Sequence, residues 1–276
     1  MIEYDDGIHL NVLSLGAGVQ SSTLALMCEY GEFPVPDAAV FADVGAEPAS
    51  VYRWLDQLEE MVTKFPIYRV QQGDLYEDSL QVKTSQKSGK RYAKTLVPFF
   101  AKKYNGGKAG MFPRKCTGDY KIAPLKRQAR KMMKDAGLKR VRQWIGISTD
   151  EASRMKDSQI QYVTHHYPLI ELGMSRQDCL DWMKAKDLPQ PPRSACVFCP
   201  YHSDAEWARL ARDEPEDFAK AVQWERDVQR NFIEQCEVTE SIPFLHGSMV
   251  TLDKALFDAR HQLDMFTVEC EGMCGV

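Results

Sequence analysis

Two cysteines separated by two residues form the clearest chemical motif in the chain. Cys196 and Cys199 lie in the stretch Leu188–His202, whose prolines oppose helix formation. A C-x-x-C pair in a loop lets two thiolates face one metal ion, whereas a redox C-x-x-C opens a helix after a strand. Cys116, which precedes a predicted helix in a very basic segment, is the best third ligand. We therefore predict a metal site at Cys116, Cys196 and Cys199.

Two further cysteines, Cys270 and Cys274, are spaced C-x3-C in a Gly-flanked tail. Either of them could complete the metal site or carry sulfur as a mobile thiol. Thiolates alone do not decide between tetrahedral zinc and an iron–sulfur cluster. The alternative to metal or sulfur chemistry is that all five cysteines are simply buried thiols.

A second chemical candidate is a glycine turn between a predicted strand and a predicted helix. The apolar run Leu10–Leu15 indicates a buried strand, and a helical pattern begins at Gln20 after Gly16-Ala17-Gly18. Small residues let backbone N–H groups approach an oxyanion, and the helix N-terminus adds partial positive charge. Ser21 and Ser22 would add hydroxyl donors. The pattern favours a phosphate site, although an ordinary strand–helix turn has the same pattern.

The elements that must position these residues alternate between strand and helix. Strands are predicted at Ala38–Asp43, Pro66–Gln71 and Gln143–Ser148, and helices at Ala49–Val62 and Asp119–Ala136. This alternation predicts an α/β fold with a mostly parallel, Rossmann-like sheet that is covered by helices on both faces. Ligands of such sheets bind beyond the carboxyl ends of the strands, which is where Asp43 and Arg154 would lie.

The second part of the chain is predicted to be helical. Helices are expected at Ser175–Lys186, Asp204–Arg212, Pro215–Cys236 and Leu252–His261. We divide the chain into a nucleotide-binding α/β domain, residues 1–170, and a helical region, residues 171–276, that completes the metal site. Within the first domain, Asp74–Phe112 loses periodicity, and Lys83–Gly110 is predicted to be a mobile basic excursion that orders on a substrate.

Charge is distributed unevenly along the 276 residues. The formal net charge is −4, yet residues 83–142 hold nineteen Lys and Arg against only Asp119 and Asp135. Such a separation favours a polyanionic partner, and we predict a nucleic acid, either tRNA or DNA. No apolar run approaches the roughly 18 residues needed to span a bilayer. Because the acidic N-terminus lacks a signal-peptide pattern, we expect a cytoplasmic protein without membrane contact.

Several of these stretches together resemble the PP-loop, or adenine nucleotide alpha-hydrolase-like, superfamily. SLGAGVQSSTLALM is similar to its pyrophosphate-binding loop, and FADVGAEP is similar to its second strand. KCTGDYKIAPLKR resembles the cysteine-bearing helix start, and WIGISTDEASR resembles the later strand with its Arg. PLIELGMSRQDCLDWM and SACVFCPYHSDAEW are similar to the phosphoadenosine phosphosulfate reductase family and its DNA- and tRNA-thiolating relatives.

The resemblance implies a site for ATP or an adenylyl sulfate-type nucleotide, with Asp43 near the adenosine and Arg154 near the phosphates. The residues that would cradle the nucleotide are Ser14, Gly16, Ala17, Gly18, Gln20, Ser21 and Ser22. The usual loop reads S-G-G-x-D-S, and Gln20 replaces the Asp that could play a magnesium-linked role. Magnesium is therefore a possible cofactor that the sequence does not decide. We expect nucleotide binding more firmly than nucleotide hydrolysis.

The resemblance also implies a 4Fe–4S cluster with three protein ligands, Cys116, Cys196 and Cys199. Thr117 stands where cluster-bearing relatives have a second adjacent cysteine, so one iron would be open or bound by Cys270 or Cys274. These two C-terminal cysteines are also the candidate catalytic thiols, because relatives without a cluster keep a catalytic Cys near the C-terminus.

Three functions follow as hypotheses. The first is an adenine-nucleotide-dependent sulfur-transfer (thiolation) enzyme that has an iron–sulfur cluster, uses a sulfur donor and acts on nucleic acid. The second is a reductase of adenosine phosphosulfate or phosphoadenosine phosphosulfate. The third is a zinc-stabilised, non-catalytic nucleotide-binding module. Each of the three is compatible with an oligomer.

Overall fold

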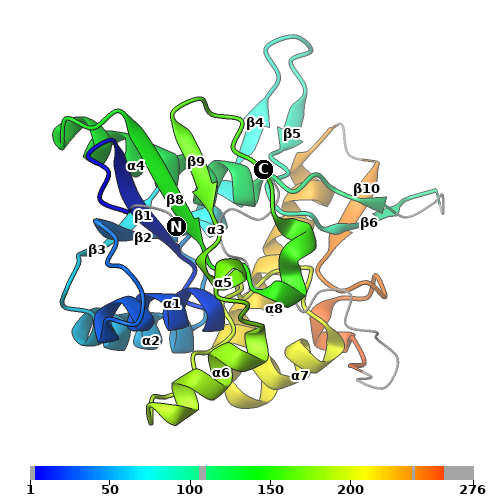
Figure 1. The fold of residues 1–276 in the computed structure, drawn as a ribbon. Coiled ribbons are helices and arrows are strands. Elements are labelled where there is room, and N and C mark those ends of the chain that lie inside the picture. The colour runs from blue at the N-terminus through cyan, green and yellow to red at the C-terminus, as the bar shows by residue number, and fades with distance from the viewer. Residues whose placement is uncertain (1–3, 106–109, 238–239, 258–276) are drawn as a thin grey trace.

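A five-stranded parallel sheet forms the centre of the molecule (Figure 1). The computed structural model describes residues 4–105, 110–237 and 240–257. In spatial order the strands are β3 (Ile67–Gln71), β2 (Ala38–Asp43), β1 (His9–Leu15), β8 (Arg140–Ile145) and β9 (Val163–His166). Each neighbouring pair is parallel, and the chain starts in the middle and winds outward in both directions. The predicted Rossmann-like sheet is confirmed.

The two faces of the sheet are covered by different helices. Successive residues of a strand point to opposite faces, so Leu13 and Leu15 pack with α1 (Val19–Tyr30) and α2 (Ala49–Met61). Leu10 and Val12 point the other way and pack with α4 (Ala123–Asp135). This helix buries Leu125, Ala129 and Met133, which recur every four residues on one face. The remaining helices beside the sheet are α5 (Pro168–Glu171) and α6 (Arg176–Ala185), of which α6 packs on α1.

A second, smaller body stands beyond the carboxyl ends of the strands. Its helices are α3 (Leu75–Ser79), α7 (Asp204–Asp213) and α8 (Pro215–Arg230), and α8 continues into the π-helical turn η3 (Asn231–Gln235). Its short strands are β4 (Val82–Thr84), β5 (Arg91–Ala93), β6 (Phe100–Lys103), β7 (Gly110–Met111) and β10 (Ser241–Phe244). Aromatic side chains fill its core, where Phe198 and Phe99 both stack on Trp224, with ring centroids 3.8 and 5.0 Å away.

The segment Asp74–Phe112, whose sequence lacks clear periodicity, contains regular elements in its described part, whereas the ordering of Lys83–Gly110 on a substrate stays a prediction. The described residues of this segment form α3, a β4–β5 hairpin and strands β6 and β7, of which β6 pairs antiparallel with β10. Strands β4, β5 and β7 are largely exposed, whereas Leu96, Val97 and Phe99, between β5 and β6, are buried in the aromatic core. The hairpin projects from the body in Figure 1.

The smaller body is joined to the sheet domain through the first turn of α2. Pro48 precedes that helix and offers no side-chain acceptor for its free N–H groups. Two carboxylates at the start of α8 accept hydrogen bonds from these N–H groups instead. Asp217 accepts from Ala49 N at 2.8 Å, and Glu214 accepts from Ser50 N at 3.3 Å. Residues more than 160 positions apart therefore complete one helix end.

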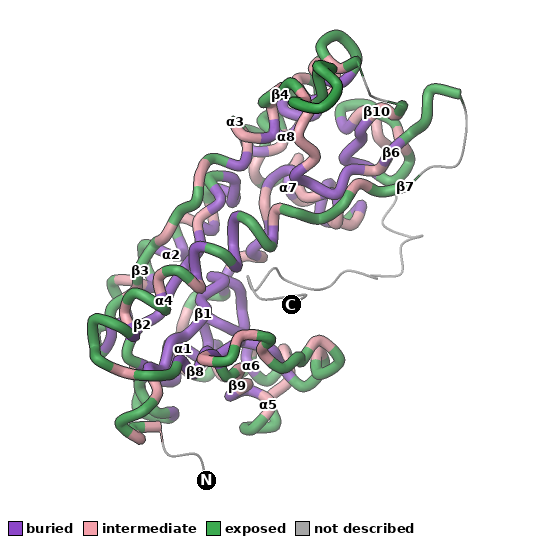
Figure 2. The backbone as a smooth tube through the Cα atoms, turned by 90° about the horizontal axis from the view of Figure 1, so that it is seen from above, coloured by how far each residue is buried: buried purple, intermediate pink, exposed green. Residues whose placement is uncertain are grey.

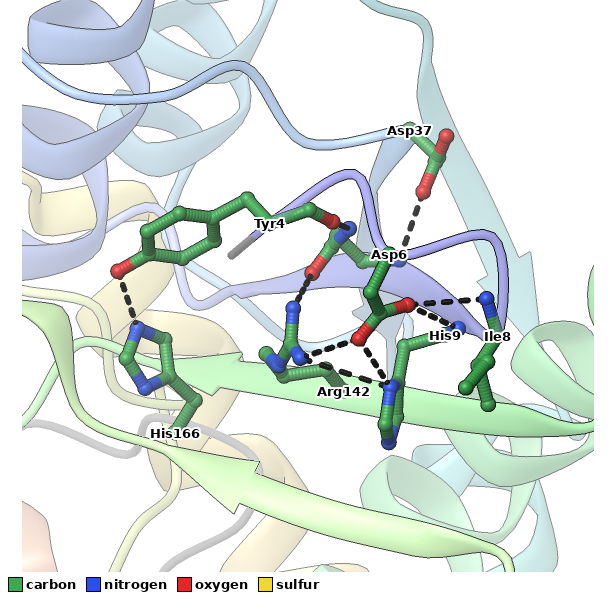
Figure 3. A network of polar contacts seen from close by, with 8 residues as sticks. Tyr4, Asp6, Ile8, His9, Asp37, Arg142 and His166 are labelled. Carbon is green, nitrogen blue, oxygen red and sulfur yellow. Dashed lines mark hydrogen bonds and ion pairs between the residues drawn. The ribbon is translucent and has the colours of Figure 1, made fainter. Parts of the chain in front are cut away.

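A polar network fastens the N-terminal segment to the sheet (Figure 3). Arg142 of β8 donates to Asn11 Oδ1 at 3.0 Å and to Asp6 Oδ2 at 2.9 Å. Asn11 Nδ2 donates to the Tyr4 carbonyl at 2.7 Å, and the Tyr4 hydroxyl lies 2.8 Å from His166 Nε2. Backbone N–H groups at the start of β1 donate to Asp6 and hold the pKa of its carboxyl well below the ordinary range. The network thus links the segment before β1 to both β8 and β9.

The helix predicted at Leu252–His261 is wrong for its described part, where only the short 3-10 turn η4 (Leu252–Lys254) forms and residues 255–257 are irregular. Within the described ranges, no helix combines the length and the apolar character that crossing a membrane requires.

Candidate functional site

The predicted phosphate turn connects β1 to α1 at the carboxyl edge of the sheet. Ala17 adopts φ +58°, a left-handed conformation that favours glycine, and Gly18 precedes the helix in an extended conformation. Two hydroxyls predicted as phosphate donors are bonded within the protein. Ser21 Oγ accepts from Gly16 N at 3.1 Å, and Ser22 Oγ accepts from Trp54 Nε1 at 2.9 Å. Both serines are fully buried, so they shape the turn.

Gly146, which the sequence interpretation missed, brings β8 against this turn. A Cβ atom on Gly146 would lie only 2.9 Å from Ser21 N and 3.0 Å from Ser21 Cα. Backbone atoms cannot move aside as a flexible side chain can, so only glycine fits here. The signal was present as a glycine directly after a predicted strand, a common mark of close backbone approach.

A buried polar network joins the end of β8 to the start of α1. Gln20 is 1% exposed, and its Nε2 lies 3.4 Å from Ser148 Oγ and 3.3 Å from Glu151 Oε2. Arg154 Nη1 donates to Glu151 Oε1 at 2.6 Å, within the 3-10 turn η2 (Thr149–Arg154). Burial raises the pKa of Glu151, and Arg154 opposes that rise. Gln20 stands where the resembled loop has Asp, and Glu151 brings a carboxylate to it from η2, the turn after β8.

Two other predicted nucleotide residues are also held by internal bonds. Asp43, at the end of β2, accepts from Gly45 N and from the Tyr52 hydroxyl, both at 2.7 Å. Burial, followed by this hydrogen bond, raises the pKa of Tyr52. Ser14 is fully buried inside β1, where its Oγ accepts from Gln143 Nε2 at 2.6 Å. Asp43 thus shapes the β2 turn, and Ser14 links two strands.

The three cysteines predicted as metal ligands line a single small cavity, here called the cysteine cavity. Cys116 is placed by its N–H, which donates to Leu96 O at 2.8 Å, directly before the π-helical segment η1 (Thr117–Ile122). The C-x-x-C stretch forms a tight turn in which Cys199 N donates to Cys196 O at 3.0 Å. Three segments that are distant in sequence therefore meet beside the end of β2.

In this conformation the three thiols do not enclose enough space for an iron–sulfur cluster. The volume of the cysteine cavity is about 30 Å³, roughly the space of one water molecule. Among the residues that the structure describes, no three His, Cys, Asp or Glu side chains are grouped so that they could hold a metal ion. The cluster and the zinc alternative therefore stay predictions, and we derive no chemical step through either of them.

A buried ion pair adjoins the cysteine cavity, and the sequence interpretation did not predict it. Lys121 Nζ lies 2.9 Å from Glu47 Oε1, and the two side chains are 7% and 0% exposed. The same carboxylate oxygen is 3.8 Å from Cys196 Sγ, while Glu47 Oε2 has no hydrogen-bond partner among the described residues. A carboxylate beside a thiol can accept its proton, and the neighbouring ammonium group compensates the charge.

His202 is hydrogen-bonded to the C-x-x-C turn. Its Nε2 lies 3.0 Å from the Cys196 carbonyl, and its ring packs edge-on against Trp207 with centroids 4.6 Å apart. Burial lowers the pKa of His202 to about 4, so the ring is neutral at pH 7 and donates from Nε2. Its role in this arrangement is to orient the turn.

A larger cavity, here called the edge cavity, lies next to the cysteine cavity and shares Phe198 with it. Its volume is about 390 Å³, within the range of pockets that hold small molecules. It is lined by Gly45, Ala46, Glu47, Ala49, Tyr52, Asp74, Tyr76, Val197, Phe198, Asp217, Lys220 and Gln223. Glu47 also lines this cavity, so one carboxylate connects it with the Cys196 thiol. The predicted catalytic residues Cys270 and Cys274 lie outside the described residues.

Comparison with solved structures finds similarities of fold. No family model matches the chain, and no curated protein sequence matches it. The chain is similar to the crystal structure of a phosphoadenylyl-sulfate (PAPS) reductase from Candida auris in complex with phosphate. The two share 12% sequence identity with a TM-score of 0.39, over 67% of this chain and 75% of the other.

Proposed function

We propose that the protein is an enzyme of sulfur chemistry that binds an adenylyl nucleotide at the carboxyl edge of its sheet. The observation that carries this proposal is the meeting of three cysteines from distant segments beside a cavity of about 390 Å³. Parallel α/β sheets bind their ligands at this edge. A thiol cavity that adjoins a ligand-sized cavity is the arrangement that thiol chemistry on a small substrate requires.

The nucleotide would occupy the region beyond β1 and β2, which are neighbours in the sheet. The turn Gly16–Ser22 leads into the N-terminus of α1, whose partial positive charge favours phosphate. In the edge cavity, Tyr52, Tyr76 and Phe198 offer ring faces on which a purine could pack. The Arg154 guanidinium donates to Glu151 in this structure. To bind a phosphate as predicted, it must either contact Glu151 and the phosphate at the same time or leave Glu151 for the phosphate.

Reduction of an adenylyl sulfate-type nucleotide is the form of this chemistry that the thiols support best. Conversion of the sulfate group to sulfite takes two electrons, which two thiols supply. One thiolate attacks the sulfur and displaces the nucleoside phosphate, and a second thiol then displaces sulfite and forms a disulfide. An external dithiol reduces that disulfide. Cys196 and Cys199 are candidates for the pair, and Cys270 and Cys274 remain predicted attacking thiols.

Sulfite release tests the reductive form. Adenosine phosphosulfate or its 3′-phosphorylated form is incubated with the protein and dithiothreitol, and sulfite is measured. We expect release by the unchanged protein, a loss of more than about 100-fold in Cys196→Ser and Cys199→Ser, and little change in Cys236→Ser. Loss in Cys274→Ala would assign the attacking thiol to the C-terminal tail. If neither nucleotide yields sulfite, the reductive form is wrong.

A second candidate is ATP-dependent thiolation of a nucleic acid, which is favoured by a surface of cations on α4 that form no ion pairs with carboxylates among the described residues. In this form ATP would activate a substrate carbonyl as its adenylate, and sulfur from a donor would displace AMP. The test is release of AMP and pyrophosphate that depends on both tRNA or DNA and a sulfide source. No release with any nucleic acid would contradict it.

The predicted metal has its own measurement, independent of either activity. Anaerobically purified protein that is brown, with absorbance near about 400 nm, would contain an iron–sulfur cluster. Colourless protein with stoichiometric zinc would support the non-catalytic zinc module instead. Metal-free protein that retains sulfite release would leave the chemistry to the thiols alone.

A further inference from the structure

The outer face of α4 carries five cations and no acidic residue before Asp135, where the helix ends. The five are Lys126, Arg127, Arg130, Lys131 and Lys134. Successive cations are one or three residues apart, so they share the side of the helix opposite Leu125 and Ala129, which are buried against the sheet. Four of the five side chains are exposed, and Lys126 is half-buried. Figure 2 places α4 beside β1 and β2.

The five α4 cations differ from most arginines elsewhere in the described chain, which pair with carboxylates. Arg69, Arg142 and Arg209 each form ion pairs with carboxylates, as do several arginines of α7 and α8. In the part of the chain that the structure describes, no ion pair with a carboxylate forms at any of the five α4 cations. Arg127 instead donates to the neutral Gln72 Oε1 at 2.6 Å. Among the described residues, no carboxylate therefore pairs directly with their charge.

An open groove of about 520 Å³ runs along this face. It is lined by Lys126, Arg127, Arg130, Lys131, Lys134 and Tyr162. The guanidinium of Arg130 lies over the Tyr162 ring, 5.7 Å from its centroid. A cationic groove that also holds an Arg–Tyr contact has the composition of surfaces that track a phosphodiester backbone and stack an unpaired base.

The helix also connects this face to the candidate site. Cys116 directly precedes η1, which continues into α4 without interruption. At about 1.5 Å of rise per residue, Lys126 lies roughly 15 Å along the helical axis from Cys116. The α4 cations and Cys116 therefore lie on, or directly before, one continuous helix.

From these observations we propose that the α4 groove binds a single-stranded nucleic acid through its phosphodiester backbone. This inference goes beyond the nucleotide chemistry proposed above and identifies the surface that the second candidate function needs. It concerns binding alone, so it can be tested without ATP, metal or turnover.

The test compares two triple variants that remove the same charge from different elements. Arg127→Gln/Lys131→Gln/Lys134→Gln alters the α4 groove. Lys83→Gln/Lys87→Gln/Lys90→Gln alters three exposed cations of the β4–β5 hairpin, within the same basic segment. The probe is a fluorescein-labelled 20-nucleotide single-stranded DNA, and anisotropy is measured from 50 to 200 mM salt with the full chain.

We expect the α4 variant to weaken binding by about tenfold or more and to lower the salt slope by about two, as expected for three lost phosphate contacts on a single strand. The hairpin variant should bind within about twofold of the unchanged protein. Equal weakening in both variants, or tighter binding to duplex DNA or to vesicles with 30% phosphatidylserine, would overturn the proposal. Binding of the adenylyl nucleotide is measured in a separate experiment. If the protein binds no nucleotide, the result of the anisotropy experiment still stands.

Discussion

At the scale of single residues, the chemistry of the candidate site depends on charges that are buried against one another. Glu47 and Lys121 are 0% and 7% exposed at the side chain and lie 2.9 Å apart. A Glu in a turn and a Lys in a basic segment are normally solvated, so sequence pattern alone could not predict this pair. The cysteines could be predicted because their spacing and loop context are local properties.

Replacement of Lys121 by Met should destabilise the fold by about 3 kcal/mol, since it leaves the Glu47 carboxylate buried without its cation. The double variant Glu47→Gln/Lys121→Met should recover most of that loss, and urea unfolding measures both. In the single variant, alkylation of Cys196 should also slow, because a thiolate forms less readily beside an uncompensated carboxylate. Equal stability of the single and double variants would contradict the coupling.

Gly146→Ala should destabilise the protein by about 1–3 kcal/mol, because the added Cβ meets backbone atoms of Ser21 at 2.9 and 3.0 Å. Gly118→Ala is the matched control, since its Cβ would meet nothing within 4 Å. Urea unfolding should place the control within about 0.5 kcal/mol of the unchanged protein or slightly above it. A neutral Gly146→Ala would mean that β8 can move away from α1.

At the scale of elements, the sequence pattern predicted those helices and strands whose formation depends on neighbouring residues. Strand β1 and the helix after it follow from apolar runs that are buried on all sides, and α4 follows from apolar residues at the spacing of one buried face. Strands β6 and β10 pair with each other although they are far apart in the sequence, with Lys103 opposite Ser241. Neither strand can therefore be predicted without its distant partner. β9 was missed because Thr164, His165 and His166 are polar, although the strand closes one edge of the sheet.

The cap of α2 is a contact between elements that gives a measurable prediction. Asp217→Ala removes the acceptor for Ala49 N and should destabilise the protein by about 1–2 kcal/mol. Asp227→Ala, which breaks a surface pair with Arg230 at 3.1 Å, serves as the control and should cost less than about 0.5 kcal/mol. Similar losses in the two variants would argue against a cap at this end of α2.

At the scale of the whole molecule, buried histidines make the stability of the fold sensitive to acid. Burial, with a smaller effect of Arg142, lowers the pKa of His166 to about 4, and burial lowers that of His202 similarly. In the unfolded chain both titrate near pH 6.5. The unfolded state therefore binds more protons between pH 6.5 and 4, so stability falls as the pH is lowered through that window.

Each of these histidines should contribute about 2 kcal/mol of lost stability between pH 7.5 and pH 5. His166→Gln should remove roughly half of the combined pH dependence, even though the variant also loses the contact with Tyr4 at 2.8 Å. The comparison uses the change in unfolding free energy with pH for each protein separately. An unchanged slope in the variant would show that His166 is already protonated in the folded protein at pH 5.

The central claim, that a nucleotide binds beside the cysteine cavity, is tested most directly by protection of individual thiols. Alkylation of each cysteine by iodoacetamide is followed by mass spectrometry with and without saturating AMP or adenosine phosphosulfate. Cys196, which is partly exposed at the cavity, should react at least about tenfold more slowly with nucleotide, and Cys236, which is also partly exposed, should be unaffected. Equal rates at Cys196 with and without bound nucleotide would contradict the account.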